Sequence, residues 1–146
     1  MHKHRIKLGI FMIISHFLIL IEVIVFWMLH GFLFEEMTTS LGLIGPLFAG
    51  YTTVIIAYII DHASVLKDDG SEVSLAFRMV SFMVPAMFVL VVAISVALWA
   101  FKVGFTEFNQ FKVLVGLLEG AFGVYVGQFI YAMFKKGAST APVVVN

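Results

Sequence analysis

The sequence predicts an all-α membrane protein with four transmembrane helices and both termini in the cytoplasm. Of its 146 residues, 62% are hydrophobic and only 12% are charged, and the mean hydropathy is +1.07. A soluble domain of this size needs far more charge to cover its surface. The hydrophobic residues gather into four runs, each long enough for the roughly 20 helical residues that cross a hydrocarbon core. We therefore expect one transmembrane domain over 1–146, with spans at 8–29, 41–60, 79–101 and 113–134 and a short tail at 137–146.

The basic residues predict the orientation of these spans. If the helices alternate in direction, seven Lys and Arg residues fall on the side of the termini and two fall on the other side. Positively charged loops stay in the cytoplasm, so both termini are expected inside. The membrane is expected to be the inner (plasma) membrane of a bacterium. This basic face also has the charge to hold an anionic regulator or a lipid headgroup. The seven are Lys3, Arg5, Lys7, Lys67, Arg78, Lys135 and Lys136, and the two are Lys102 and Lys112.

The first span carries three polar residues in an otherwise apolar helix. Ser15 and Glu22 are seven residues apart and share a face, while His16 is turned by about 100° from Ser15. Beyond this span, Glu35 and Glu36 lie in the outer connection. They are expected either to stabilise the N-terminus of the second helix, capped at Thr39 or Ser40, or to form an acidic outer mouth that concentrates cations.

The second and third spans differ in their packing surfaces. The second has a stripe of small residues that includes Gly42, and Pro46 is expected to kink it, which favours either close helix packing or a hinge. The third span is the most uniformly apolar of the four, which is typical of a scaffold helix that faces lipid.

The fourth span contains a glycine stripe beside an acid. Gly116, Gly120, Gly123 and Gly127 fall at spacings of four, three and four, so they share one narrow face. In a bilayer, such a face lets helices approach closely, which predicts a homo-oligomer with this helix at its packed core or pore. Glu119 lies about 60° from the stripe, and Gln128 lies on a different face.

Depth in the membrane suggests how these polar residues are related. Counted from the inner ends of the predicted spans, Glu22 and Glu119 both lie about 21 to 22 Å from the cytoplasmic face, whereas His16 lies about 9 Å nearer to it. No Lys or Arg lies within a span. Each acid is then expected to be protonated, hydrated or facing a cation, as in an ion pathway. The alternative is that both acids only bond neighbouring helices and that His16 is a packing residue.

The motifs of enzymes and of nucleic-acid binding are absent from the sequence. It has no nucleophile elbow, no glycine-rich phosphate loop and no metal-binding cluster, so we expect no catalytic activity, cofactor or metal. The leading hypothesis is an oligomeric, cation-conducting channel or pore. The alternatives are a small transporter coupled to protons or cations and a non-catalytic anchor or inhibitory subunit of a larger complex. The build of the chain is similar to that of small membrane effectors of bacterial defence and lysis systems, and also to that of small multi-span transporters.

Overall fold

The computed structural model of the protein describes residues 2–62 and 75–130. These residues form four α-helices and one π-helical segment that continues the last of them. The elements are α1 (His2–Met28), α2 (Phe34–His62), α3 (Leu75–Ala100), α4 (Phe108–Tyr125) and η1 (Val126–Ile130). Lys67, Lys135, Lys136 and the tail 137–146 lie outside the described residues, as do the side chains of Lys3 and Arg78.

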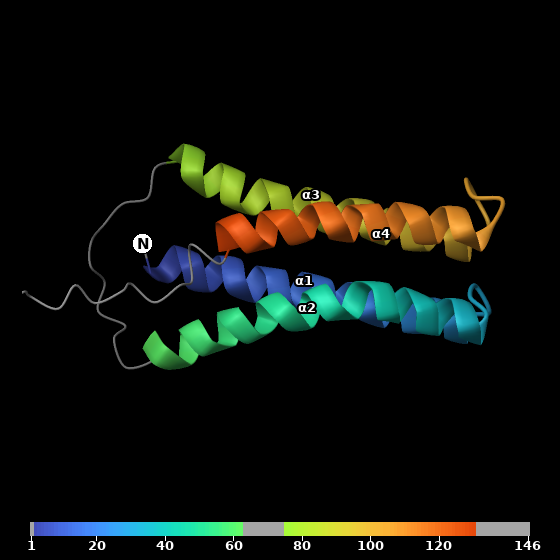
Figure 1. Ribbon diagram of the computed structural model, residues 1–146, viewed down its shortest axis with the longest axis horizontal. Helices are drawn as coiled ribbons and strands as arrows, with labels where there is room; N and C mark the ends of the chain where they lie inside the picture. Colours follow the sequence, from blue (N-terminus) through green and yellow to red (C-terminus); the bar gives the residue numbers. More distant parts are fainter. Residues whose placement is uncertain (1, 63–74, 131–146) are drawn as a thin grey trace, which may run out of the picture.

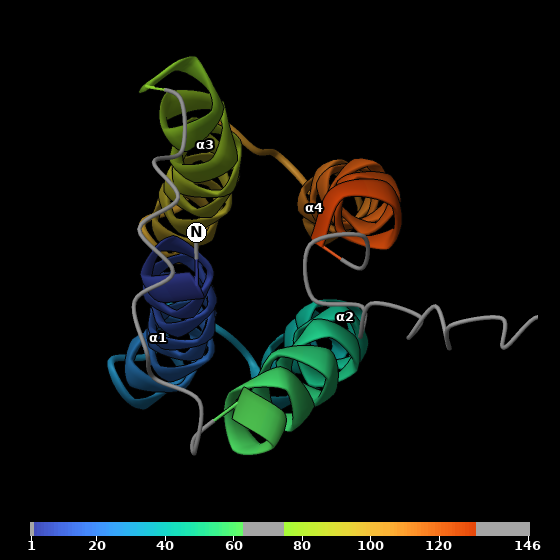
Figure 2. The same ribbon diagram turned by 90° about the vertical axis from the view of Figure 1, so that its left-hand side faces the viewer.

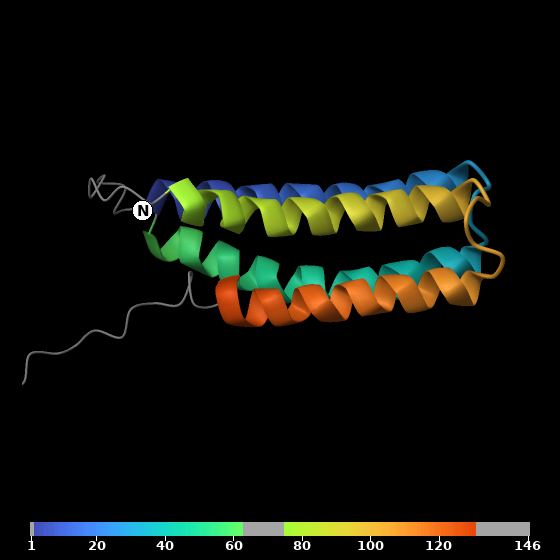
Figure 3. The same cartoon turned by 90° about the horizontal axis from the view of Figure 1, so that it is seen from above.

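The helices run up and down in an elongated bundle (Figure 1, Figure 3). α1 packs against α2 and α3, and α4 packs against the same two helices. α1 and α4 therefore occupy opposite corners of the bundle, as Figure 2 shows. The start of α1 and the end of α4 lie at the same end of the bundle (Figure 1), as four alternating helices require.

All four helices are long and apolar enough to span a membrane, which confirms the predicted all-α class with four candidate spans. The qualifying segments are His4–Met28, Phe34–Ile60, Met79–Ala100 and Phe108–Gln128. Large apolar side chains such as Ile14, Phe17 and Leu18 point away from the bundle and are exposed. An apolar outer surface of this kind suits a lipid environment, so the chain is a candidate multi-pass membrane protein.

The buried residues follow a helical period on each helix. On α1 they include Leu8, Met12, Ile19 and Val23, all at most 1% exposed. On α4 the buried positions are Phe111, Val115, Glu119 and Phe122. Glu119 is therefore built into the core-facing stripe of α4, between apolar neighbours.

The second helix begins earlier than the capping residues predict. α2 starts at Phe34, so the expectation of a cap at Thr39 or Ser40 is wrong. The carboxylate of Glu36 accepts a hydrogen bond of 2.9 Å from the N–H of Leu33, and Ser40 donates to the carbonyl of Glu36 at 2.7 Å. A glutamate that reaches back to the residue before the helix satisfies one of the unpaired N–H groups at that end. Glu35 and Glu36 thus lie in the first turn, where the helix dipole favours acids.

Candidate functional site: the buried His16–Glu119 pair

The centre of the bundle contains an acid and a base from opposite corners. His16 on α1 and Glu119 on α4 face each other, with 3.7 Å between Nε2 of His16 and Oε1 of Glu119. The two side chains are only 1% and 7% exposed. A buried acid and a buried base at this separation interact strongly because little water screens them.

Aromatic rings from the other three helices enclose the imidazole. The His16 ring stacks with those of Phe48, Phe88 and Phe122, with ring centroids 5.9, 5.4 and 6.0 Å away. Tyr51 presents its ring edge-on to His16 at 5.3 Å. These four rings form an aromatic cage around the imidazole.

Three buried polar atoms of the pair lack hydrogen-bond partners among the described residues. These atoms are Nε2 of His16 and both carboxylate oxygens of Glu119. The 3.7 Å separation is too long for a hydrogen bond, although a small side-chain movement would form one. Leaving a buried polar group unpaired costs about 1 to 3 kcal/mol, and a charged one costs more. The pair is therefore poised to take up a proton or a small polar or cationic ligand.

Tyr51 is fixed beside the pair by the backbone of α1. Its hydroxyl donates to the carbonyl of Met12 at 3.3 Å, and the Ser15 hydroxyl donates to the same carbonyl at 3.2 Å. Tyr51 is the titratable side chain that α2 places against His16. Among the α3 side chains that the structure describes, none is ionisable. The charge balance at the centre of the bundle thus rests on His16 and Glu119.

The predicted layer of two acids is not present, because Glu119 lies level with His16 and not with Glu22. Glu22 is six residues further along α1, a rise of about 9 Å, and is partly exposed. Depths counted from the inner ends of the predicted spans are wrong because α1 begins at His2, six residues before the predicted start at residue 8. Short connections instead align the helix ends at the end of the bundle where α1 joins α2 and α3 joins α4, and these ends are called the outer ends below. Measured from those ends, at Met28 of α1 and Phe108 of α4, His16 and Glu119 lie at nearly the same depth.

Two other candidate pathway groups lie away from the pair. Gln128 is exposed in η1, nine residues from Glu119, a distance of about 13 Å along the helix. At the outer end Glu35 is exposed, whereas Glu36 joins the ends of α2 and α3. The carboxylate of Glu36 accepts a hydrogen bond from Nε1 of Trp99 at 3.4 Å and lies 3.7 Å from Nζ of Lys102.

The small-residue faces of α2 and α4 are largely unused within the chain. A Cβ built on Gly42, Gly116, Gly120 or Gly127 would meet no atom within 4 Å. Gly123 is different, because a Cβ there would lie 3.6 Å from Cδ1 of Leu47 on α2. Pro46 lies within α2 and is exposed. These faces remain available for another helix, as the predicted packing role requires.

The pair offers few ligands for a metal ion. One imidazole nitrogen and one carboxylate fall short of the three or four protein ligands of typical zinc sites. Within residues 2–62 and 75–130, no group of three or more His, Cys, Asp or Glu residues is placed to bind a metal.

The aromatic cage around His16 is not predicted from the sequence. Phe48, Tyr51, Phe88 and Phe122 resemble ordinary apolar residues of a membrane helix, and only their common depth distinguishes them. Phe88 lies about as far from the outer end of α3, at Ala100, as His16 does from the outer end of α1. Phe122 lies about one turn beyond Glu119 on α4. The common depth of the cage residues and His16 is apparent only when the four helices are aligned at their outer ends.

No protein family, curated protein or solved structure was found to match this chain.

Proposed function

We propose that the chain is a proton-linked membrane transport protein in which the His16–Glu119 pair binds and releases the proton. One observation supports this most strongly: an acid and a base, each more than nine-tenths buried, face each other at 3.7 Å with unpaired polar atoms. Ionisable residues inside membrane proteins commonly mark proton relays and substrate sites because they are costly to bury. Histidine side chains serve as proton shuttles in proteins.

The enclosure of the pair favours a transporter over a pore that one chain forms alone. Rings from α2, α3 and α4 surround His16, so a proton reaches the pair only when helices or rings move. A site at mid-membrane that opens by such movement is the arrangement on which alternating access depends. The cytoplasmic position of both termini, supported by the bias of the basic residues, and a bacterial inner membrane form part of this proposal.

An oligomeric, cation-conducting channel is the second candidate function. It is supported by the open faces at Gly42, Gly116, Gly120 and Gly127, where other copies have room to pack. In such an assembly, Glu22 and Gln128 would line the pathway and Glu35 would lie at its outer mouth. The anchor or inhibitory-subunit alternative has no specific observation in its favour.

Proton movement through purified protein tests the proposal. Liposomes containing a pH-sensitive dye are reconstituted with the wild type, His16→Gln, Glu119→Gln or Glu35→Gln, and a membrane potential is imposed with potassium and valinomycin. We expect the wild type and the exposed-site control Glu35→Gln to acidify the lumen faster than empty liposomes do. His16→Gln and Glu119→Gln should fall to the rate of empty liposomes, and wild-type rates in both variants would overturn the proposal.

A further inference from the structure

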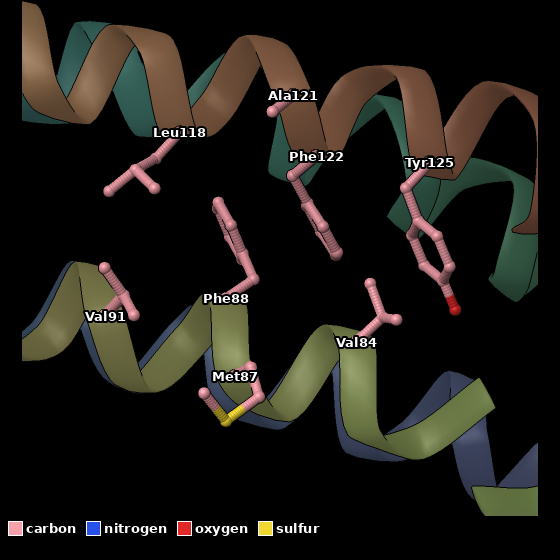
Figure 4. Close-up of a pocket in the computed structure, with 8 residues that line it drawn as sticks. All are labelled: Val84, Met87, Phe88, Val91, Leu118, Ala121, Phe122 and Tyr125. Carbon is pink, nitrogen blue, oxygen red and sulfur yellow. The ribbon is translucent and has the colours of Figure 1, made fainter. Parts of the chain in front are cut away.

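An apolar groove runs between α3 and α4 on the side of the bundle that faces away from α1 and α2. Its volume is about 280 Å³. Figure 4 shows Phe88 and Phe122 pointing toward each other across it, with Val91 and Leu118 on one side and Val84 and Tyr125 on the other. Met87 and Ala121 complete the lining. Val84, Met87 and Val91 are exposed on the apolar outer surface, so the groove opens toward the lipid.

The stacked rings of Phe88 and Phe122 separate this groove from the buried pair. Their centroids are 3.9 Å apart and their planes are nearly parallel, at 6°. Both rings also stack with His16, which is not part of the groove lining. A single aromatic layer therefore lies between a lipid-facing groove and a carboxylate whose oxygens lack hydrogen-bond partners among the described residues.

The chemistry along this route selects for one class of molecule. An apolar groove admits a hydrophobic body, and the faces of aromatic rings attract positive charge. A buried carboxylate without a hydrogen-bond partner would bind a cation in place of a proton, whereas it would repel an anion. The lining residues provide no cationic group that would bind an anionic headgroup.

We propose that the substrate is a lipophilic organic cation that enters from the bilayer through the α3–α4 groove. This inference rests on the proposed function. Phe88 and Phe122 move apart as the cation passes, and it binds against Glu119. The carboxylic acid of Glu119 gives its proton to water as the cation binds, so the site exchanges one positive charge for another. His16 faces Glu119 from α1 and Tyr51 lies beside it from α2, and protonated His16 opposes cation binding. Binding should therefore tighten as the pH rises.

Tetraphenylphosphonium is a suitable probe because tetraphenylborate matches its size and apolar surface but has the opposite charge. Binding of each ion to the purified protein in detergent is measured by equilibrium dialysis, and released protons are counted in weakly buffered solution. We expect saturable binding of the phosphonium, with release of about one proton per cation, and no saturable binding of the borate. Glu119→Gln should weaken phosphonium binding by roughly 30-fold or more, as the loss of one member of a buried charge pair does.

Variants at the lipid-facing surface test the route without disturbing the core. Ala121→Phe fills the groove and should weaken binding by about tenfold, within the range of steric overpacking costs. Val124→Phe adds the same bulk at an exposed position of α4 outside the groove lining and should bind like the wild type. The inference is overturned if the phosphonium does not bind saturably, or if Ala121→Phe binds it as the wild type does. If the liposomes still show proton movement that depends on His16 and Glu119, the proposed function stands and only the substrate class fails.

Discussion

The imidazole of His16 and the carboxylate of Glu119 meet across the diagonal of the bundle, with 3.7 Å between Nε2 and Oε1. The pair is enclosed by apolar and aromatic side chains, and three of its polar atoms lack hydrogen-bond partners among the described residues. Packing alone does not account for this arrangement, because an apolar pair would fill the same space without the cost of burying ionisable groups. Such a cost is expected where the groups have a function.

Replacing the pair by apolar residues should stabilise the fold and abolish proton movement. In the double variant His16→Phe with Glu119→Leu, the new ring stays in the aromatic cage and the leucine occupies the space of the acid. Apolar replacement of a buried ion pair is often stabilising, by about 1 to 4 kcal/mol. Thermal unfolding in detergent, followed by circular dichroism, measures the stability, and the dye-loaded liposomes measure the activity. Lower stability together with wild-type proton movement would contradict the functional role of the pair.

Enlarging a glycine on the open face of α4 should disturb assembly and leave the single chain folded. A Cβ added at Gly120 meets no atom of the other helices within 4 Å, so we expect the chain itself to accommodate Gly120→Leu unless another copy packs there. We expect a smaller oligomer in size-exclusion chromatography with light scattering, and an unchanged helical circular dichroism spectrum. Val124→Leu, a similar change at an exposed position of α4, is the control. If Gly120→Leu and the wild type have the same oligomeric mass, copies do not meet at this face.

Removing the carboxylate of Glu36 should loosen the outer end of the bundle. This group accepts hydrogen bonds from the N–H of Leu33 and from Trp99, so Glu36→Ala removes both a helix cap and a link to α3. Losing a helix-capping residue costs about 0.5 to 2 kcal/mol, which should lower the thermal unfolding midpoint. Lys102→Met should have a smaller effect, because Lys102 is 54% exposed and surface ion pairs contribute little. Equal effects of the two variants would show that the ion pair, and not the cap, holds this end.

The four helices were predictable because composition and run length determine them with little competition from other patterns. The helix ends were harder to predict, since α2 begins at Phe34 through the side chain of Glu36, whereas Thr39 and Ser40 offered the more familiar capping pattern. Glu119 and His16 were each recognised as unusual polar residues, but their pairing was not. The pairing depends on which helices lie at opposite corners of the bundle and on how their outer ends align. A single sequence carries little information on the helix arrangement or on the alignment. The aromatic cage follows from the same arrangement in space.

The protonation of Glu119 tests the central claim most directly. A protonated carboxyl group gives a carbonyl band in the infrared difference spectrum, and this band is recorded as the pH is varied between about 5 and 8, the range in which histidine titrates. We expect a band that is absent in Glu119→Gln and whose pH midpoint differs in His16→Gln, since Nε2 of His16 lies 3.7 Å from the carboxylate. If the band does not change over this range, or if its midpoint is the same with and without His16, the two residues do not form a proton-binding pair.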